Sequence, residues 1–285
     1  MKNTQRQVII AGNWKMHKTT RQATALVEEI QSAADGEKNL PEIVLIPPFT
    51  ALVAVEKCLR KSAIKLGAQN MDWHDEGAFT GEISPLMLTD LNVQYVLVGH
   101  SERRQYFGET NTTTPLRIKA ALTHGIKPIL CVGEMIDERE AGLTDAVVSR
   151  QVGAALGELN SEQFFHVSIA YEPVWAIGTG NHCAAAEANR VCGMIRKTVA
   201  ALLARLEDST GNGEPFNANR LPILYGGSVK GSNIAEYVKQ EHIDGALVGG
   251  ASLISEEFLA IIQAAQERVK RAAKATPSNT PTAHR

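Results

Sequence analysis

The sequence predicts an α/β protein in which most of the 285 residues form a single (β/α)8 barrel. Short apolar runs recur along the whole chain, and each is followed by a longer amphipathic segment. The runs are rich in Val, Ile and Leu and lack apolar/polar alternation, which is typical of parallel strands buried on both faces. Eight such units in about 250 residues favour one barrel over a doubly wound sheet.

Each expected element follows from this pattern, in chain order. The apolar runs predict strands at 8–12, 43–47, 64–69, 95–99, 128–133, 167–171, 222–225 and 246–249. Segments rich in Ala, Leu, Glu, Lys and Arg predict crossover helices at 20–34, 115–124, 144–159, 184–206 and 256–273.

The domain organisation follows from the connections between these elements. None has the length and composition of an interdomain linker, although 208–220 is a polar, Gly-containing loop that we expect on the rim. Residues 1–272 are therefore expected to be one domain. Residues 273–285, which contain the polar stretch TPSNTPTAHR, are expected to be a disordered tail.

Composition argues against several kinds of partner. Lys and Arg total 29 against 31 Asp and Glu, so the net charge of −2 gives no footprint for nucleic acid or an anionic membrane. No stretch approaches 18 consecutive apolar residues, and the first residues lack the architecture of a signal peptide. The four cysteines are scattered, as reduced structural thiols are, so a cytoplasmic protein is expected.

The residues that follow the first and fourth strands are candidates for the reacting groups, because barrels of this kind place chemistry at the carboxyl ends of the strands. Lys15 either extends to solvent or points into the mouth of the barrel, where it can hold an anion. A polar cluster runs from Gly99 to Arg104. A helix starting near Ser101 would favour a neutral His100 ring that can polarise a carbonyl, whereas a structural histidine is the alternative.

The sixth strand ends in a carboxylate followed by an apolar loop. Burial of Glu172 would make it a stronger base. The loop at 173–179 starts with Pro and carries Trp and Ile, so it can either close over the site and exclude water or simply pack on the rim.

Paired glycines follow the seventh and eighth strands, at Gly226–Gly227 and Gly249–Gly250. Glycine lets backbone amides approach an anion closely, and barrels commonly hold phosphate at these two strand ends. We expect a phosphate site there.

Five motifs, each at the end of a different expected strand, resemble the triosephosphate isomerase family. They are GNWKM at 12–16, GHSERR at 99–104, AYEPVWAIGTG at 170–180, YGGSV at 225–229 and VGGASL at 248–253, and the resemblance spans about residues 8 to 270. It implies a TIM barrel that interconverts dihydroxyacetone phosphate and D-glyceraldehyde 3-phosphate through an enediolate, in glycolysis and gluconeogenesis. It also implies a reaction without metal or organic cofactor.

The resemblance assigns a role to each residue at the reacting carbons. Glu172 would move the proton between adjacent carbons, and neutral His100 would polarise the carbonyl oxygens. Lys15 and Asn13 would lie beside the developing charge. Two supporting residues complete the set: Glu102 would help to fix Asn13 and Lys15, and Ser101 would hold Glu172 in the open site.

The resemblance also implies how phosphate and a second subunit are bound. Backbone amides would hold the phosphate at Gly178, Ser228, Gly249 and Gly250, under a lid formed by 173–179. The segment 69–82 resembles the family's dimer loop, with Thr80 at its tip, so a homodimer is expected.

Three alternatives remain open at this point. An isomerase of a four-carbon ketose phosphate such as erythrulose phosphate would use the same proton shuttle. An aldolase requires a Schiff-base lysine where Glu172 stands, and a non-catalytic sugar-phosphate scaffold would not need every acid and base position.

The chain departs from the family in having Gly231–Ser232 where Pro-x is common. The remaining histidines lack ligand spacing, so no metal is expected.

Overall fold

A computed structural model describes residues 6–177, 182–207 and 216–275 of the chain. Within these residues, eight parallel strands form one closed barrel with neighbours in sequence order, and β8 pairs with β1. The strands are β1 (Ile9–Asn13), β2 (Glu42–Ile46), β3 (Lys65–Ala68), β4 (Tyr95–Val98), β5 (Lys127–Val132), β6 (Ser168–Tyr171), β7 (Ile223–Tyr225) and β8 (Gly245–Val248).

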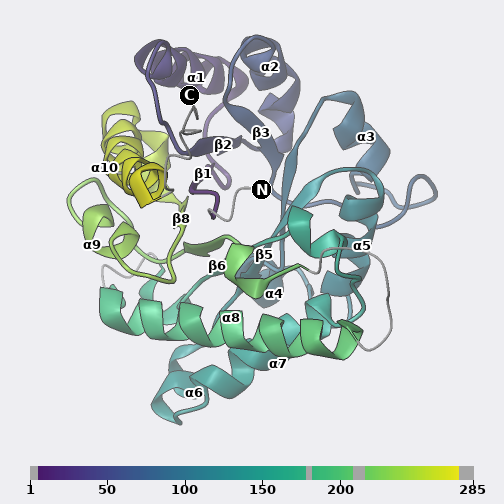
Figure 1. The fold of residues 1–285 in the computed structure, drawn as a ribbon. Coiled ribbons are helices and arrows are strands. Elements are labelled where there is room, and N and C mark those ends of the chain that lie inside the picture. The colour runs from purple at the N-terminus through teal and green to yellow at the C-terminus, as the bar shows by residue number, and fades with distance from the viewer. Residues whose placement is uncertain (1–5, 178–181, 208–215, 276–285) are drawn as a thin grey trace, which may run out of the picture.

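Helices surround the barrel on its outside, as Figure 1 shows. They are α1 (Thr20–Ala34), α2 (Phe49–Leu59), α3 (Pro85–Asp90), α4 (Ser101–Tyr106), α5 (Thr114–Thr123), α6 (Ile136–Glu140), α7 (Thr144–Leu156), α8 (Ala185–Glu207), α9 (Ile234–Val238) and α10 (Ser255–Ala275). Short 3-10 turns lie at Gln163–His166, Val174–Ala176, Ala218–Arg220 and Gly250–Leu253.

Two apolar layers explain why the strand sequences do not alternate between apolar and polar residues. Alternate strand residues such as Ile9, Ala11 and Leu97 point inward and fill the barrel. Their neighbours, such as Ile10 and Val96, point outward and pack with the helices in a larger cluster. Both faces of each strand are therefore buried, as the sequence predicted.

The predicted fold class is confirmed. Every expected strand is present, and its ends lie within one residue of the prediction. The prediction for 20–34 coincides with α1, whereas the helix expected at 144–159 ends earlier, at Leu156, where Gly157 caps it. Helix α10 continues to Ala275, past the expected domain boundary at residue 272.

The amino end of the barrel is tied together by one buried carboxylate. The side chain of Asp244, which is 0% exposed, accepts from Arg6 at 2.7 Å, from Arg196 at 3.0 Å and from Arg268 at 2.7 Å. It also accepts from the amide of Ile223 at 3.1 Å. These partners come from the start of the described chain, α8, α10 and β7, so one residue links four parts of the fold.

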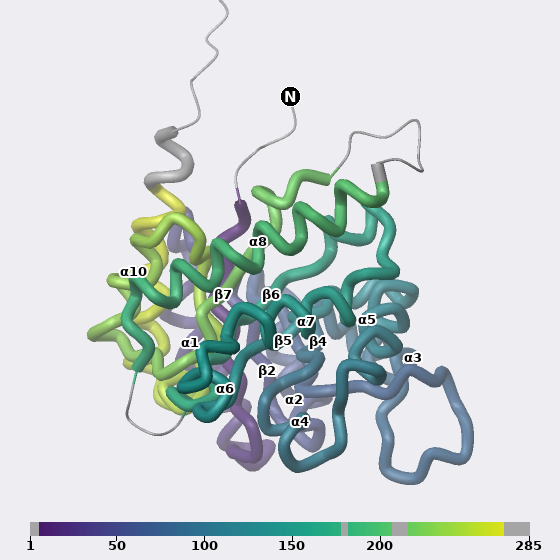
Figure 2. Tube along the Cα trace, turned by 90° about the horizontal axis from the view of Figure 1, so that it is seen from below, coloured from purple at the N-terminus to yellow at the C-terminus, as the bar shows by residue number. Residues whose placement is uncertain are grey.

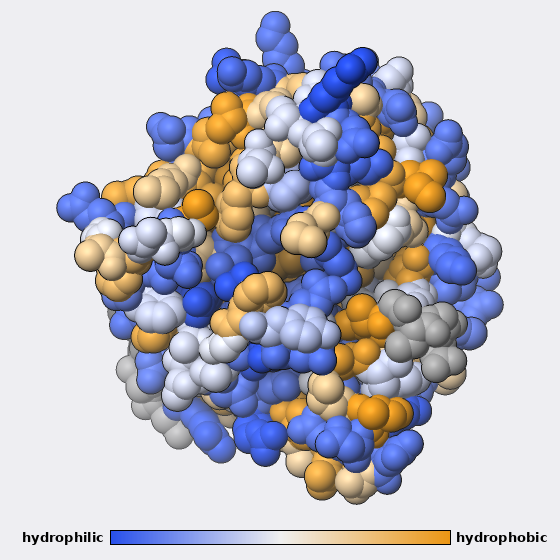
Figure 3. Space-filling model, turned by 180° about the vertical axis from the view of Figure 1, so that it is seen from behind, coloured by the Kyte–Doolittle hydropathy of each residue, from blue (hydrophilic) through white to orange (hydrophobic). Residues whose placement is uncertain are grey.

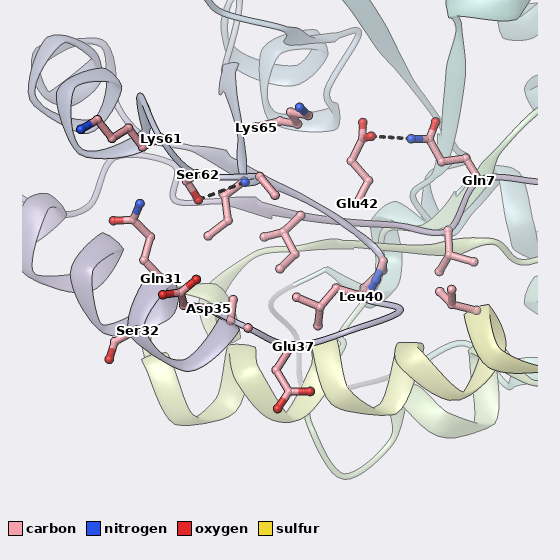
Figure 4. Close-up of a pocket in the computed structure, with 18 of the residues that line it drawn as sticks. Gln7, Gln31, Ser32, Asp35, Glu37, Leu40, Glu42, Lys61, Ser62 and Lys65 are labelled. Carbon is pink, nitrogen blue, oxygen red and sulfur yellow. Dashed lines mark hydrogen bonds between the residues drawn. The ribbon is translucent and has the colours of Figure 1, made fainter.

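A cavity of about 1030 Å³ also lies at this amino end, beside the first residues of β1, β2 and β3. Its lining mixes apolar residues with charged ones, among them Lys61, Lys65, Asp35 and Glu37 on the segments that enclose it (Figure 4). Glu42, which lines this cavity, is bonded to Gln7, as the dashed line shows. The cavity is at the opposite end of the barrel from the predicted site.

No described helix is long and apolar enough to cross a membrane.

We expect Asp244→Asn to lower the free energy of unfolding by about 3–5 kcal/mol, because the neutral amide leaves clustered guanidinium groups without a buried counter-charge. Urea unfolding followed by circular dichroism measures the change. Asp145→Asn is the matched control, since Asp145 is an exposed partner of Arg190 and its loss should cost much less. Equal losses in the two variants would contradict the importance assigned to Asp244.

Candidate active site

The candidate active site is a cavity of about 540 Å³ at the carboxyl ends of the strands. Figure 3 shows this end of the molecule, which is hollowed near its centre. Residues at or just after the ends of β1, β4, β6, β7 and β8 line the cavity, among them Asn13, Lys15, His100, Glu172 and Ser228. Closure of the barrel therefore gathers side chains that are far apart in the sequence.

Glu172 lies directly after β6 and is only 2% exposed. Its Oε2 accepts a hydrogen bond from the backbone amide of Ser101 at 3.0 Å, and its Oε1 lies 3.2 Å from Nε2 of His100. The backbone of Glu172 packs against Gly133, where an added Cβ would lie 1.7 Å from the Glu172 carbonyl oxygen. Glycine at position 133 is thus required for the carboxylate to sit where it does.

His100 caps the amino end of α4. Its Nδ1 accepts from the amide of Glu102 at 3.2 Å, so Nδ1 carries no proton in this arrangement. The remaining nitrogen, Nε2, is then the protonated one in the neutral ring, and it points toward Glu172 in the cavity. A neutral imidazole held in this tautomer can donate to a ligand oxygen.

Lys15 is held in an uncommon backbone conformation, with φ of +51°. Its amide donates to Asn13 Oδ1 at 3.0 Å, and its carbonyl accepts from Gln69 Nε2 at 2.8 Å. Its Nζ bonds Glu102 Oε1 at 2.6 Å. Among the described residues Glu102 makes no bond to Asn13, so the expected link between those two side chains runs through Lys15.

Three of the four expected phosphate residues line the same cavity: Ser228, Gly249 and Gly250. An added Cβ on Gly249 would lie 3.8 Å from Lys15 Nζ, so the ammonium group stands next to these backbone amides. Ser228 Oγ donates to the carbonyl of Ala176 at 2.9 Å, which ties this region to the start of the apolar loop. Gly178, the fourth expected residue, lies outside the described residues.

Glu134, after β5, is a residue that the sequence analysis missed. Its side chain is fully buried and accepts from the indole of Trp175 at 2.9 Å and from the hydroxyl of Tyr171 at 3.2 Å. Desolvation raises the pKa of Glu134, and these bonds and Arg139 oppose the shift. Reading the fifth strand end by the rule applied to the others would have found it.

The segment 69–82 extends from the body of the molecule (Figure 2). Thr80 is exposed, while Trp73 is half-buried beneath the guanidinium of Arg117, 4.7 Å from the ring centre. Hydrophobic side chains are unusually exposed here and nearby: Met16 at 95%, Phe79 at 43% and Met87 at 56%. Hydrophobic surface also gathers over α3 in Figure 3.

This arrangement can bind a small phosphorylated carbonyl compound and move a proton on it. Glu172 can accept a proton from carbon, His100 can donate to an oxygen, and Lys15 adds positive charge beside Gly249 in the same cavity. Among the residues that the structure describes, no group of three or more His, Cys, Asp or Glu side chains is arranged to hold a metal.

Comparison with known proteins gives one consistent result. The family model for triosephosphate isomerase matches residues 8–265. The chain is 50% identical to a triosephosphate isomerase of Synechococcus sp. (strain JA-3-3Ab) over 261 residues, which cover 90% of this chain and 94% of the relative. It is 47% identical to the triosephosphate isomerase of Dictyoglomus thermophilum over 258 residues, with coverage of 90% and 99%.

Titration of Glu134 should be visible through Trp175. Because burial raises the pKa of Glu134, lowering the pH should protonate it, and weaken its bond to the indole, before exposed glutamates titrate. We expect a step in tryptophan fluorescence that is absent in Glu134→Gln and in Trp175→Phe. A step that persists in Glu134→Gln would assign the titration to another group.

Proposed function

Because this chain belongs to the triosephosphate isomerase family, we propose that the residues gathered at its strand ends carry out the proton transfer of that reaction. The chain is an intramolecular aldose–ketose isomerase that interconverts dihydroxyacetone phosphate and D-glyceraldehyde 3-phosphate, a step of glycolysis and gluconeogenesis. The observation that carries the assignment of residues is the 3.2 Å approach of Glu172 Oε1 to His100 Nε2 in the cavity.

Glu172 is the base. Its carboxylate removes a proton from the carbon next to the carbonyl and returns it to the neighbouring carbon. Glu172 makes two contacts in the cavity, with the Ser101 amide and with His100, and a substrate that enters replaces them with contacts of its own. The carboxylate is therefore held in place before substrate arrives and becomes available when those contacts are exchanged.

His100 and Lys15 stabilise the enediolate. Nε2 of His100 donates to the two oxygens in turn, because Nδ1 is already occupied as an acceptor. The ammonium group of Lys15 contributes a positive charge and is held in place by Glu102. The side chain of Asn13 holds the Lys15 backbone. Ordered groups of this kind stabilise charge without reorganising during the reaction.

The phosphate is held at the other end of the cavity by the amides of Ser228, Gly249 and Gly250. Gly178 belongs to this set by family resemblance alone. The loop at 173–179 is the lid, and the bond from Ser228 to the Ala176 carbonyl couples phosphate binding to the start of that loop. Closure protects the enediolate from water.

The four-carbon alternative is not favoured, because the similar proteins are named for the triose phosphate reaction. The direct test is a coupled assay with D-glyceraldehyde 3-phosphate and erythrulose phosphate in parallel, with EDTA present. We expect turnover of the three-carbon substrate, and preference for the four-carbon substrate would overturn that reading.

A homodimer is part of this proposal. Phe79 lies on the projecting 69–82 segment, and Met16 and Met87 are further exposed hydrophobic side chains that a second copy of the chain would cover. We also propose a cytoplasmic location, which the four free thiols support.

Glu172→Gln should lower kcat by about 10²- to 10⁴-fold, because the amide keeps the shape of the carboxylate but cannot accept the proton. Steady-state kinetics measure this, and circular dichroism checks that the variant is folded. Glu158→Gln, on the exposed surface, is the matched control and should keep full turnover. Near-normal kcat in Glu172→Gln would sink the assignment of the base.

Thr80→Glu should shift the protein toward monomers, since it places a charge at the tip of a segment that we expect a partner subunit to bury. Sedimentation equilibrium measures the mass. Thr123→Glu, an exposed threonine at the end of α5, should leave the mass unchanged. A wild-type protein that sediments as a monomer would contradict the proposal outright.

A further inference from the structure

Two charged side chains hold the backbone of Gly99, the residue that precedes His100. The amide of Gly99 donates to Glu109 Oε1 at 2.6 Å, and the carbonyl of Gly99 accepts from Arg104 Nε at 2.8 Å. Neither side chain lines the active-site cavity. Both polar groups of one backbone residue are thus bound by ionised side chains, and such hydrogen bonds are stronger than neutral ones.

The two charged side chains are themselves fixed. The Glu109 side chain is fully buried, and its second oxygen accepts from Arg103 Nε at 3.1 Å. Arg104 is half-buried, and its Nη1 donates to Asn111 Oδ1 at 2.8 Å. Glu109, Arg104 and their partners therefore form a network that leaves little freedom to the Gly99 peptide.

Packing restricts the same position. Gly99 has φ of +76°, which residues with a side chain rarely adopt. An added Cβ would lie 2.8 Å from Arg104 Nη2 and 3.1 Å from the carbonyl oxygen of Cys131. Packing and hydrogen bonds therefore both fix the direction of the backbone from Gly99 to His100.

We propose that Arg104 and Glu109 are positioning residues for His100. By holding the Gly99 peptide they set the direction of the imidazole, whose Nε2 lies 3.2 Å from Glu172 Oε1. This inference rests on the proposed role of His100 in polarising the substrate carbonyl. Loss of the contact would misplace the ring, and small misplacements of reacting groups can cost large factors in rate.

Arg104 gives the cleaner test, because Glu109 also binds Arg103. Arg104→Met removes the donor to Gly99 and keeps a long side chain. We expect kcat to fall by about 10- to 100-fold with KM little changed, since the phosphate amides are not part of this network.

A double-mutant cycle separates positioning from general destabilisation. If Arg104 acts through His100, then Arg104→Met should lower kcat by less than about 2-fold in a His100→Gln background. If Arg104→Met lowers kcat by the same factor with His100 and with Gln at position 100, the proposal is overturned. If His100→Gln alone leaves kcat unchanged, the proposed role of His100 fails and this inference fails with it.

Arg268→Met is the matched control. Arg268 Nη1 donates to the carbonyls of Val238 and Gln240 at 3.0 and 2.7 Å, at the opposite end of the barrel. Its loss should lower Tm without changing kcat.

If Arg104→Met fails to fold, Arg104→Lys replaces it in the double-mutant cycle, because lysine keeps the charge but cannot bind Gly99 and Asn111 at the same time. Nitrogen-15 spectra report on the His100 ring directly. A purely structural role of Arg104 would leave the ring signals unchanged in the Arg104 variant.

Discussion

Closure of the barrel is the constraint on which the rest of the structure depends. Each strand must hydrogen-bond on both sides, so the eight carboxyl ends meet in one ring and β8 returns to β1. Lys15, His100, Glu172 and Gly249 belong to different strand ends spread over most of the chain, yet they line one cavity. The buried sheet is also rigid, because apolar side chains pack on both of its faces. The strands fix the positions, and the residues at their carboxyl ends are the candidates for the chemistry.

Tight contacts then refine what closure brings together. Gly133 and Gly226 both lie against Glu172, and a methyl group at either position would reach within 2.8 Å of Glu172 atoms. The Ser101 amide holds one carboxylate oxygen and His100 faces the other. Lys15 keeps its strained backbone because Asn13 and Gln69 bind its amide and carbonyl. Local strain is thus compensated by hydrogen bonds from the end of β1 itself, through Asn13, and from the end of β3, through Gln69.

The sequence predicted the barrel and the position of most site residues, because buried parallel strands and paired glycines leave clear local patterns. Contacts between distant segments leave no such pattern. The position of Glu134 at a strand end can be read from the sequence, but its bonds to Tyr171 and Trp175, about forty residues further along, follow only from the pairing of β5 with β6. The left-handed backbone of Lys15 and the hold of Arg104 on Gly99 are likewise properties of folded geometry. That Glu102 bonds Lys15 but, among the described residues, not Asn13 is likewise a detail of side-chain geometry that residue spacing does not resolve.

The ion-pair cluster at the amino end has a consequence for connectivity. Arg6 precedes the first strand and Arg268 belongs to the last helix, yet both bind Asp244. The first and last described elements are therefore neighbours in space. Loops connect the other neighbouring units covalently, whereas these two are joined only by noncovalent contacts. The fold is circular in three dimensions although the chain is linear. A circularly permuted chain, joined at this junction and opened at a surface loop elsewhere, would keep every strand pairing.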